Sequence, residues 1–200
     1  MNFSERLHTY KQVYTNPGDS FAKIAKKDFQ ITDGLINYVI AAIFASISVA
    51  IASAINMWLL LDFDMMSIIT SVAVIGIGSL ISGVILSLVL AWLYHFMAGI
   101  LGGKGKYANL YFAISSVAVP LSILSLLQII PCLGSIINII ASLYAVYIIT
   151  IAISKIYELD MLKSVAAWLV PAIVVSIALF VLAALGAVLF FGPAVAAVGG

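Results

Sequence analysis

The chain has 200 residues, of which 64% are hydrophobic and only 8% are charged. Soluble domains carry about 25% charged residues, so the eight acidic and nine basic residues of this chain are too few to cover a soluble domain. The net charge is +1, and the basic residues stand only beside apolar runs, which excludes a nucleic-acid-binding surface. The single cysteine excludes an intramolecular disulfide and a cysteine-based metal site.

Residues 1–33 form a polar arm that carries five of the nine basic residues. Ser4 is a predicted N-cap, and the helix after it has apolar residues at helical spacing on one face. These residues are Phe3, Leu7, Tyr10 and Tyr14. Asn16 and Pro17 then predict the start of a second helix, as N-cap and first helical residue. The arm has no short apolar core, so no cleavable signal peptide is expected.

The second helix of the arm has an apolar stripe, formed by Phe21, Ile24, Ala25 and Phe29. Three lysines flank this stripe: Lys23, Lys26 and Lys27. The pattern predicts a helix in the headgroup region, with its apolar side in lipid and its lysines against anionic headgroups. The alternative is a basic arm that lies in solvent.

Five apolar runs follow the arm, each long enough for a helix to cross about 30 Å of hydrocarbon. They cover residues of about 35–61, 66–101, 107–130, 135–154 and 164–191. The fold class is therefore all-α, a polytopic membrane bundle of five transmembrane helices preceded by short amphipathic helices. Small residues recur at every fourth position in the first two runs, which is typical of helices that approach closely in membranes. They are Ser46, Ala50 and Ala54, then Ser79, Gly83 and Ser87.

Short loops connect these spans. Asp62 and Asp64 predict a hydrated acidic turn, and residues 131–134 (Pro-Cys-Leu-Gly) join spans three and four into a tight hairpin. Pro120 removes a helical hydrogen bond in span three, so a kink is expected near Ser116. Ser115 and Ser116 are expected to satisfy the carbonyl groups freed there.

The distribution of basic residues predicts an orientation. With the arm in the cytoplasm, all nine basic residues lie on that side of the membrane, as the positive-inside rule requires. The chain then divides into a cytoplasmic arm (1–33), a transmembrane domain (34–192) and a short tail outside the cell (193–200).

The sequence contains no pattern typical of catalysis, metal binding or cofactor binding. No charged residue lies in the centre of a span, which argues against proton relays, ion-coupled transporters and voltage sensors. Gly102, Gly103 and Lys104 lack the spacing and the Ser or Thr of a phosphate-binding loop, and they indicate a helix end. His95 is interpreted as a structural histidine near the membrane interface. Polar residues within the spans are expected to bond between helices: Asn37, Asn56, Asn138 and Ser142.

Residues 101–120 resemble the Yip family, membrane proteins named for their interaction with Ypt/Rab GTPases. The matching residues are Leu101, Gly102, Gly103, Lys104, Tyr107, Tyr111 and Pro120. Asn16-Pro17 followed by Phe21 and Ile24 is similar to the start of prokaryotic members, and the five-span layout also agrees. The resemblance therefore covers nearly the whole chain.

This resemblance implies a non-enzymatic protein of a bacterial or archaeal cell membrane. Eukaryotic members act in vesicle traffic between the endoplasmic reticulum and the Golgi. The Asp-Leu-x-Gly-Pro motif and the long cytoplasmic domain of those members are implicated in GTPase binding. Both are absent before the first span, which argues against GTPase binding by this chain. For prokaryotic members the resemblance supplies no established activity.

We therefore expect a membrane scaffold or adaptor that contacts anionic lipid headgroups and packs against other membrane helices or a second copy of itself. The rival hypothesis is a small-solute transporter or channel, with a path along the Pro120 kink and the Asn and Ser residues of spans three and four. A continuous polar cavity flanked by Asn138, Ser142 and Tyr147 would favour transport. Dry packing of Ala, Gly and Ser would favour the scaffold. A membrane enzyme is disfavoured because ionisable residues do not cluster.

Overall fold

The computed structural model describes residues 1–60, 65–130 and 133–198. Helices make up nearly all of this part of the chain, and it contains no strand. The helices are α1 (Phe3–Thr15), α2 (Pro17–Lys26), α3 (Ile31–Leu60), α4 (Met65–Ile100), α5 (Tyr107–Ser125), the 3-10 helix η1 (Leu126–Ile129), α6 (Leu133–Tyr157) and α7 (Met161–Val198). The acidic turn predicted at Asp62 and Asp64 and the turn at residues 131–132 lie outside the described residues.

Five of these helices, α3 to α7, are long and apolar enough to cross a membrane. The all-α polytopic bundle predicted from the sequence is therefore confirmed. The first span begins four residues earlier than predicted, at Ile31, because the Asp33 carboxylate accepts a hydrogen bond from the Gln30 N–H (3.3 Å) and helps to start the helix there. The third span ends earlier than predicted, at Ser125, and continues as η1.

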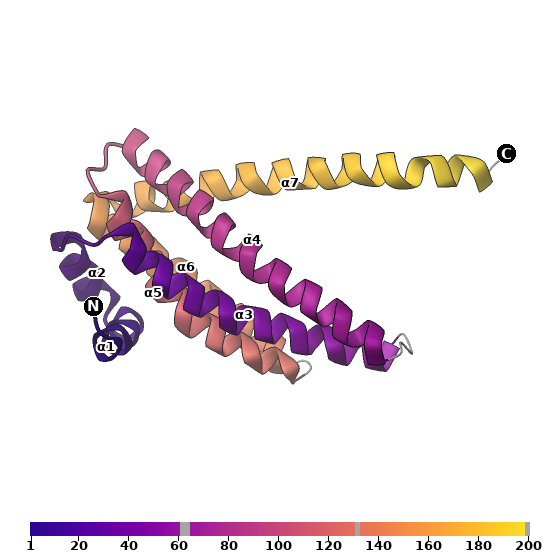
Figure 1. The fold of residues 1–200 in the computed structure, drawn as a ribbon. Helices are drawn as coiled ribbons and strands as arrows, with labels where there is room; N and C mark the ends of the chain where they lie inside the picture. The colour runs from indigo at the N-terminus through magenta and orange to yellow at the C-terminus, as the bar shows by residue number, and fades with distance from the viewer. Residues whose placement is uncertain (61–64, 131–132, 199–200) are drawn as a thin grey trace.

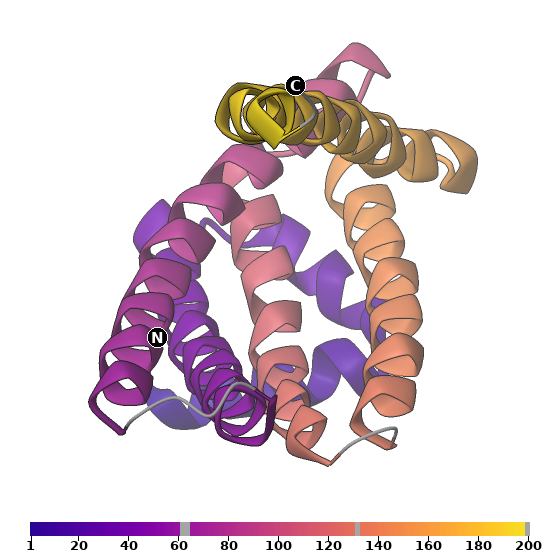
Figure 2. The same cartoon turned by 90° about the vertical axis from the view of Figure 1, so that its right-hand side faces the viewer.

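Helix α3 packs along both α4 and α5, and α6 packs along the opposite side of α5 (Figures 1 and 2). Helix α7 starts at the same end of the bundle as the α4–α5 loop and then runs away from α3, α5 and α6 (Figure 1). Its first turns are fastened to α6, because the Trp168 Nε1–H donates to Thr150 Oγ1 at 2.9 Å. We call the end of the bundle that carries Lys104, Lys106, Lys155 and Lys163 the lysine end.

Small residues line the contact between α3 and α4. Their recurrence at every fourth position predicts such a close approach. The Ser79 hydroxyl donates to Ser46 Oγ at 3.3 Å, and a Cβ placed on Gly76 would lie 3.9 Å from the Cβ of Ala50. These faces therefore form a contact within the bundle.

The closest approach between α3 and α5 is at Gly34. A Cβ at this position would lie 2.6 Å from Tyr111 Cδ1 and 3.1 Å from the backbone nitrogen of Phe112. Tyr111 and Phe112 are fully buried, and they belong to the tightest part of the core. Only glycine allows the two helix backbones to come this close.

The buried face of α1 differs from the predicted one. Phe3 and Leu7 are 68% and 51% exposed, whereas Arg6, Tyr10 and Val13 are buried. The N-cap is Asn2, whose side chain accepts from the Glu5 N–H at 2.8 Å, and Ser4 lies inside the helix. The face is decided by the polar partners that Arg6 finds on α3, which apolar periodicity does not reveal.

Helix α2 begins at Asn16 and Pro17 as predicted, but protein and not lipid buries its apolar stripe. Phe21 and Ile24 lie in the core cluster formed with α5 and α6, and Phe29 stacks on Phe112 with ring centroids 3.8 Å apart. The prediction that this stripe lies in lipid is therefore wrong, because apolar residues of α5 and α6 pack against it.

Helix α5 remains α-helical through Pro120. The hydroxyl groups of Ser115 and Ser116 both donate to the Phe112 carbonyl, at 2.9 and 2.7 Å, one turn before the carbonyl that proline leaves without its usual donor. The expectation that these serines satisfy the freed carbonyl is therefore wrong. The carbonyl that lacks its usual donor belongs to Ser116. The Tyr14 hydroxyl of α1 donates to the carbonyl of the next residue, Val117, at 2.9 Å.

We expect Gly34→Ala to destabilise the purified protein by about 1–3 kcal/mol, the usual cost of inserting a methyl group into a packed core. The added methyl must push α3 away from the backbone of α5. Gly78→Ala is the matched control, because nothing lies within 4 Å of a Cβ there. The thermal midpoint should fall for Gly34→Ala alone, and equal midpoints for the two variants would contradict the close approach.

Candidate functional site

A buried polar cluster fixes α1 to the bundle. The Arg6 side chain is 5% exposed, and its guanidinium donates to the Asp33 carbonyl at 3.0 Å and to the side-chain oxygen of Asn37. It also forms an ion pair with the Asp33 carboxylate at 3.3 Å. The arginine is therefore held by two residues in the first turns of α3.

Asn37 is the centre of this cluster. It is fully buried, and its side-chain oxygen also accepts from the Tyr10 hydroxyl at 2.8 Å. Its amide nitrogen donates to Ser116 Oγ at 3.0 Å. One side chain on α3 therefore joins α1 to α5, which confirms the expected role of Asn37 between helices.

Asn109 on α5 fastens α2 in a similar way. Its amide nitrogen donates to the carbonyl groups of Ile24 (3.1 Å) and Lys27 (2.8 Å), and its oxygen accepts from the Phe29 N–H (3.3 Å). The last carbonyl groups of a helix have no partner within the helix. Asn109 supplies partners for those of α2 and thereby ties α2 to α5.

Tyr14 completes the attachment of the arm. The Tyr144 hydroxyl of α6 donates to the Tyr14 carbonyl at 2.7 Å, while the Tyr14 hydroxyl bonds to α5. Burial, with a smaller contribution from Tyr144, raises the pKa of Tyr14 to about 12. The Tyr14 hydroxyl therefore stays protonated, and remains a donor, at any physiological pH.

Most of the residues that carry the family resemblance meet at the lysine end. Gly102 has a φ of +93°, and the Gly103 N–H donates to the Ala98 carbonyl at 2.9 Å, which closes α4 as a glycine-terminated helix. A Cβ on Gly103 would lie 2.7 Å from the Cβ of Tyr157, so this glycine also brings the loop against α6. Lys104 is exposed.

Tyr107 and Tyr111 connect α5 to its neighbours. Their rings stack on each other, and the Tyr111 hydroxyl bonds to Ser87 Oγ on α4 at 3.1 Å. His95 contacts the edge of the Tyr107 ring and hydrogen-bonds the Tyr157 hydroxyl. These motif residues and His95 therefore have structural contacts. Pro120 lies farther along α5 and does not join this group.

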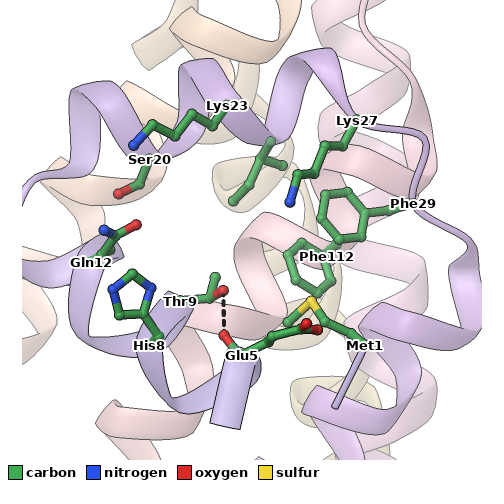
Figure 3. Close-up of a pocket in the computed structure, with 11 residues that line it drawn as sticks. Met1, Glu5, His8, Thr9, Gln12, Ser20, Lys23, Lys27, Phe29 and Phe112 are labelled. Atoms are coloured by element: carbon green, nitrogen blue, oxygen red, sulfur yellow. Dashed lines mark hydrogen bonds between the residues drawn. The ribbon is translucent and has the colours of Figure 1, made fainter. Parts of the chain in front are cut away.

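A pocket of about 280 Å³ lies between α1 and α2 (Figure 3). Its lining is Met1, Glu5, His8, Thr9, Gln12, Ser20, Lys23, Ile24, Lys27, Phe29 and Phe112. In Figure 3 the stacked rings of Phe29 and Phe112 form one wall, and Lys23 and Lys27 lie across from α1. The pocket combines an apolar wall with both signs of charge.

A second pocket, of about 320 Å³, lies among α3, α4, α5 and α6. Most of its lining consists of Ala, Ser and Gly. Asn138 also lines it, and within the described residues its amide nitrogen has no hydrogen-bond partner. Ser142 and Tyr147, the predicted flanks of a polar path, are exposed on the outside of α6. The Asn138 amide nitrogen therefore does not form the expected interhelical bond. The prediction for Asn56 falls on a side chain that the structure does not describe.

The lysines predicted to contact lipid are all exposed: Lys23 and Lys26 on α2, and Lys27 as its C-cap residue. They do not form one face: Lys23 and Lys27 line the pocket of Figure 3, whereas Lys26 points to a different pocket, described below. Within the described residues, no group of three or more His, Cys, Asp or Glu side chains is placed to hold a metal ion.

The sequence did not identify Arg6, Asp33 or Asn109 as partners. Arg6 carried a signal, since it lies one turn before Tyr10 on the same face of α1. Asn109 stands in the first turn of an apolar span, where a polar side chain is costly unless it is bonded. Both signals show that a partner is needed, but neither shows which one.

The helices and their apolar surfaces define an all-α, multi-pass integral membrane protein. Residues 11–185 match the family model of the Yip1 domain. The chain therefore belongs to the Yip family. No curated protein and no solved structure matches it.

We expect Asn37→Ala to loosen α1 from the bundle, because Arg6, Tyr10 and Ser116 would each lose a partner while buried. Leaving such groups unsatisfied costs roughly 1–3 kcal/mol each, and more for a charged one. Hydrogen exchange of residues 3–15, measured in detergent micelles by mass spectrometry, should become faster. Lys11→Gln, on the exposed side of α1, is the control and should leave exchange unchanged. Similar exchange in both variants would show that Asn37 does not hold the arm.

Proposed function

We propose that this Yip-family protein is a non-enzymatic scaffold or adaptor of a cell membrane. The observation that carries the proposal is the closed packing of the bundle around α5. Leu110, Phe112 and Val117 are essentially without exposed surface, and the buried polar side chains beside them, Ser115 and Ser116, bond to backbone. This packing leaves the long outer faces of α4 and α7 as the surfaces available to lipid or to other helices.

The rival proposal, a solute path, has less support. Within the described part of the chain, the pocket beside Asn138 is the feature in its favour. Its other lining residues are mostly small, and the polar side chains expected to extend it, Ser142 and Tyr147, face outward. A path for a polar solute needs consecutive polar groups across the hydrocarbon. The Ala, Ser and Gly residues that dominate this lining favour the scaffold instead.

We also propose the orientation, with the N-terminus in the cytoplasm and the C-terminus outside. The arm and the four remaining lysines lie at the same end of the bundle, so one orientation puts every basic residue inside. The exposed lysines Lys23, Lys26 and Lys27 would then face anionic headgroups of the inner leaflet. Such contact is diffuse and is screened by salt.

The scaffold proposal predicts that photo-crosslinking in native membranes captures one reproducible adduct. The crosslinking residue is placed at Val74, Ile77 or Ile85, which are exposed on α4. Ala98, which is fully buried, is the control position and should give none. The absence of any adduct from all three exposed positions would contradict the scaffold. Flux of small solutes through liposomes containing the purified protein would instead support the path.

The orientation predicts from which side of the membrane a thiol reagent can reach each introduced cysteine. In a Cys132→Ser background, Lys104→Cys and Glu158→Cys should react only after the cell membrane is permeabilised. Asp64→Cys should react with an impermeant maleimide in intact cells. Reaction of all three from the same side would refute both the orientation and the number of crossings.

A further inference from the structure

A third pocket, of about 390 Å³, lies at the lysine end, where α2, the α4–α5 loop and the end of α6 meet. The residues that line it include Lys26, Lys104, Gly105, Lys106, Lys155 and Glu158. We call it the lysine pocket. Four lysines from three segments therefore line one cavity together with a single acidic residue.

Most of the positive charge in the lysine pocket has no internal partner. Lys106 forms an ion pair with Asp28, and this contact holds the pKa of the Asp28 carboxyl below its usual value. The side chains of three other lysines form no ion pair or hydrogen bond with any residue of 1–60, 65–130 and 133–198: Lys26, Lys104 and Lys155. Like charges gathered in this way repel one another, and an anion placed among them would relieve the repulsion.

The backbone that carries the lysines is held in place. A Cβ on Gly105 would lie 2.6 Å from the Ile156 carbonyl oxygen, and the Lys104 N–H donates to the Tyr157 carbonyl at 3.4 Å. The loop is therefore pressed against the end of α6, backbone to backbone. Helix α2, which supplies Lys26, is held in turn by the hydrogen bonds from Asn109 to the carbonyl groups of Ile24 and Lys27.

Glu158 adds an independent sign that this end of α6 is specialised. Its φ is +56°, and the Leu159 N–H bonds back to the Ser154 carbonyl at 3.1 Å, which is the helix ending that usually has glycine at this position. A residue with a Cβ is strained there, and such strain is concentrated at functional sites. Here it places a carboxylate at the edge of the lysine pocket.

We propose that the lysine pocket binds a phosphate group, carried by the headgroup of an anionic lipid or by a soluble phosphate compound. Lysine binds phosphate as a point charge. The volume leaves room for the group to which the phosphate is esterified. The pocket also stands where α4 and α6 end and α5 begins, at the level of lipid headgroups, and basic pockets between membrane helices bind such headgroups. The proposal does not depend on the scaffold role.

The test is native mass spectrometry of the purified full-length protein in neutral detergent, with phosphatidylglycerol or phosphatidylcholine added. The variant Lys26→Gln/Lys104→Gln/Lys155→Gln removes the lysines without a partner and leaves the Lys106–Asp28 pair. The control Lys11→Gln/Lys23→Gln/Lys27→Gln removes the same charge from outside the pocket, so its loss of lipid measures the diffuse headgroup contact of Lys23 and Lys27. A lysine near anionic lipid is worth roughly fivefold in affinity, so retention of phosphatidylglycerol should fall at least about tenfold more in the pocket variant than in the control.

A third variant keeps the test independent of lost stability. Glu158→Gly removes the carboxylate and suits the positive φ, so the protein should fold at least as well and bind phosphatidylglycerol more tightly. Displacement of the lipid by inorganic phosphate would assign the pocket to soluble phosphates as well. Resistance to displacement would assign it to the lipid headgroup. Equal retention of the two lipids by the unmodified protein, or equal loss in both triple variants, would overturn the proposal.

Discussion

The amide of Asn37 must find all its hydrogen-bond partners within the protein, because it is fully buried in a helix that crosses the membrane. It finds them in Arg6 and Tyr10 of α1 and in Ser116 of α5. Removal of α1 would leave the side-chain oxygen of Asn37 without the donors Arg6 and Tyr10 in an apolar surrounding. The N-terminal helices are therefore a part of the bundle, and their position follows from a requirement of the first and third spans.

A second constraint acts at the lysine end, where glycines take the place of side chains. Gly103 and Gly105 allow the α4–α5 loop to lie directly on the end of α6, and Gly34 does the same for α3 and α5. Backbone contacts therefore fix the relative positions of these spans. The lysines of this region need no ion pairs to hold the fold, which leaves most of them available to bind something else.

The parts of the fold that depend on local sequence were predictable. Each span is a long apolar run, and helix length follows from the thickness of the hydrocarbon. The small residues around Ser46 and Ser79 predicted faces of close helix approach, and Pro17 predicted the start of α2. In each case the signal is local, because residues within a few turns of one another carry it.

The parts that depend on distant residues were not predictable. The apolar stripe of α2 indicated that something covers it, but lipid and protein would satisfy Phe21 equally well. On α1, apolar spacing favoured Phe3 and Leu7, whereas an arginine with partners on α3 decided the outcome. The lysine pocket combines residues from three segments, and no spacing in the sequence relates Lys26 to Lys155. Sequence patterns show which side chains need partners, and tertiary contacts supply them.

The hydrogen bonds of Asn109 to the end of α2 have a mechanical consequence. Residues 1–26 are attached to the bundle at two places, since Asn37 holds α1 and Asn109 holds α2. Force applied to the N-terminus would be transmitted to the first turn of α5 and to the loop before it. A protein fused to this terminus would sit at a fixed distance from the bundle and would turn with it.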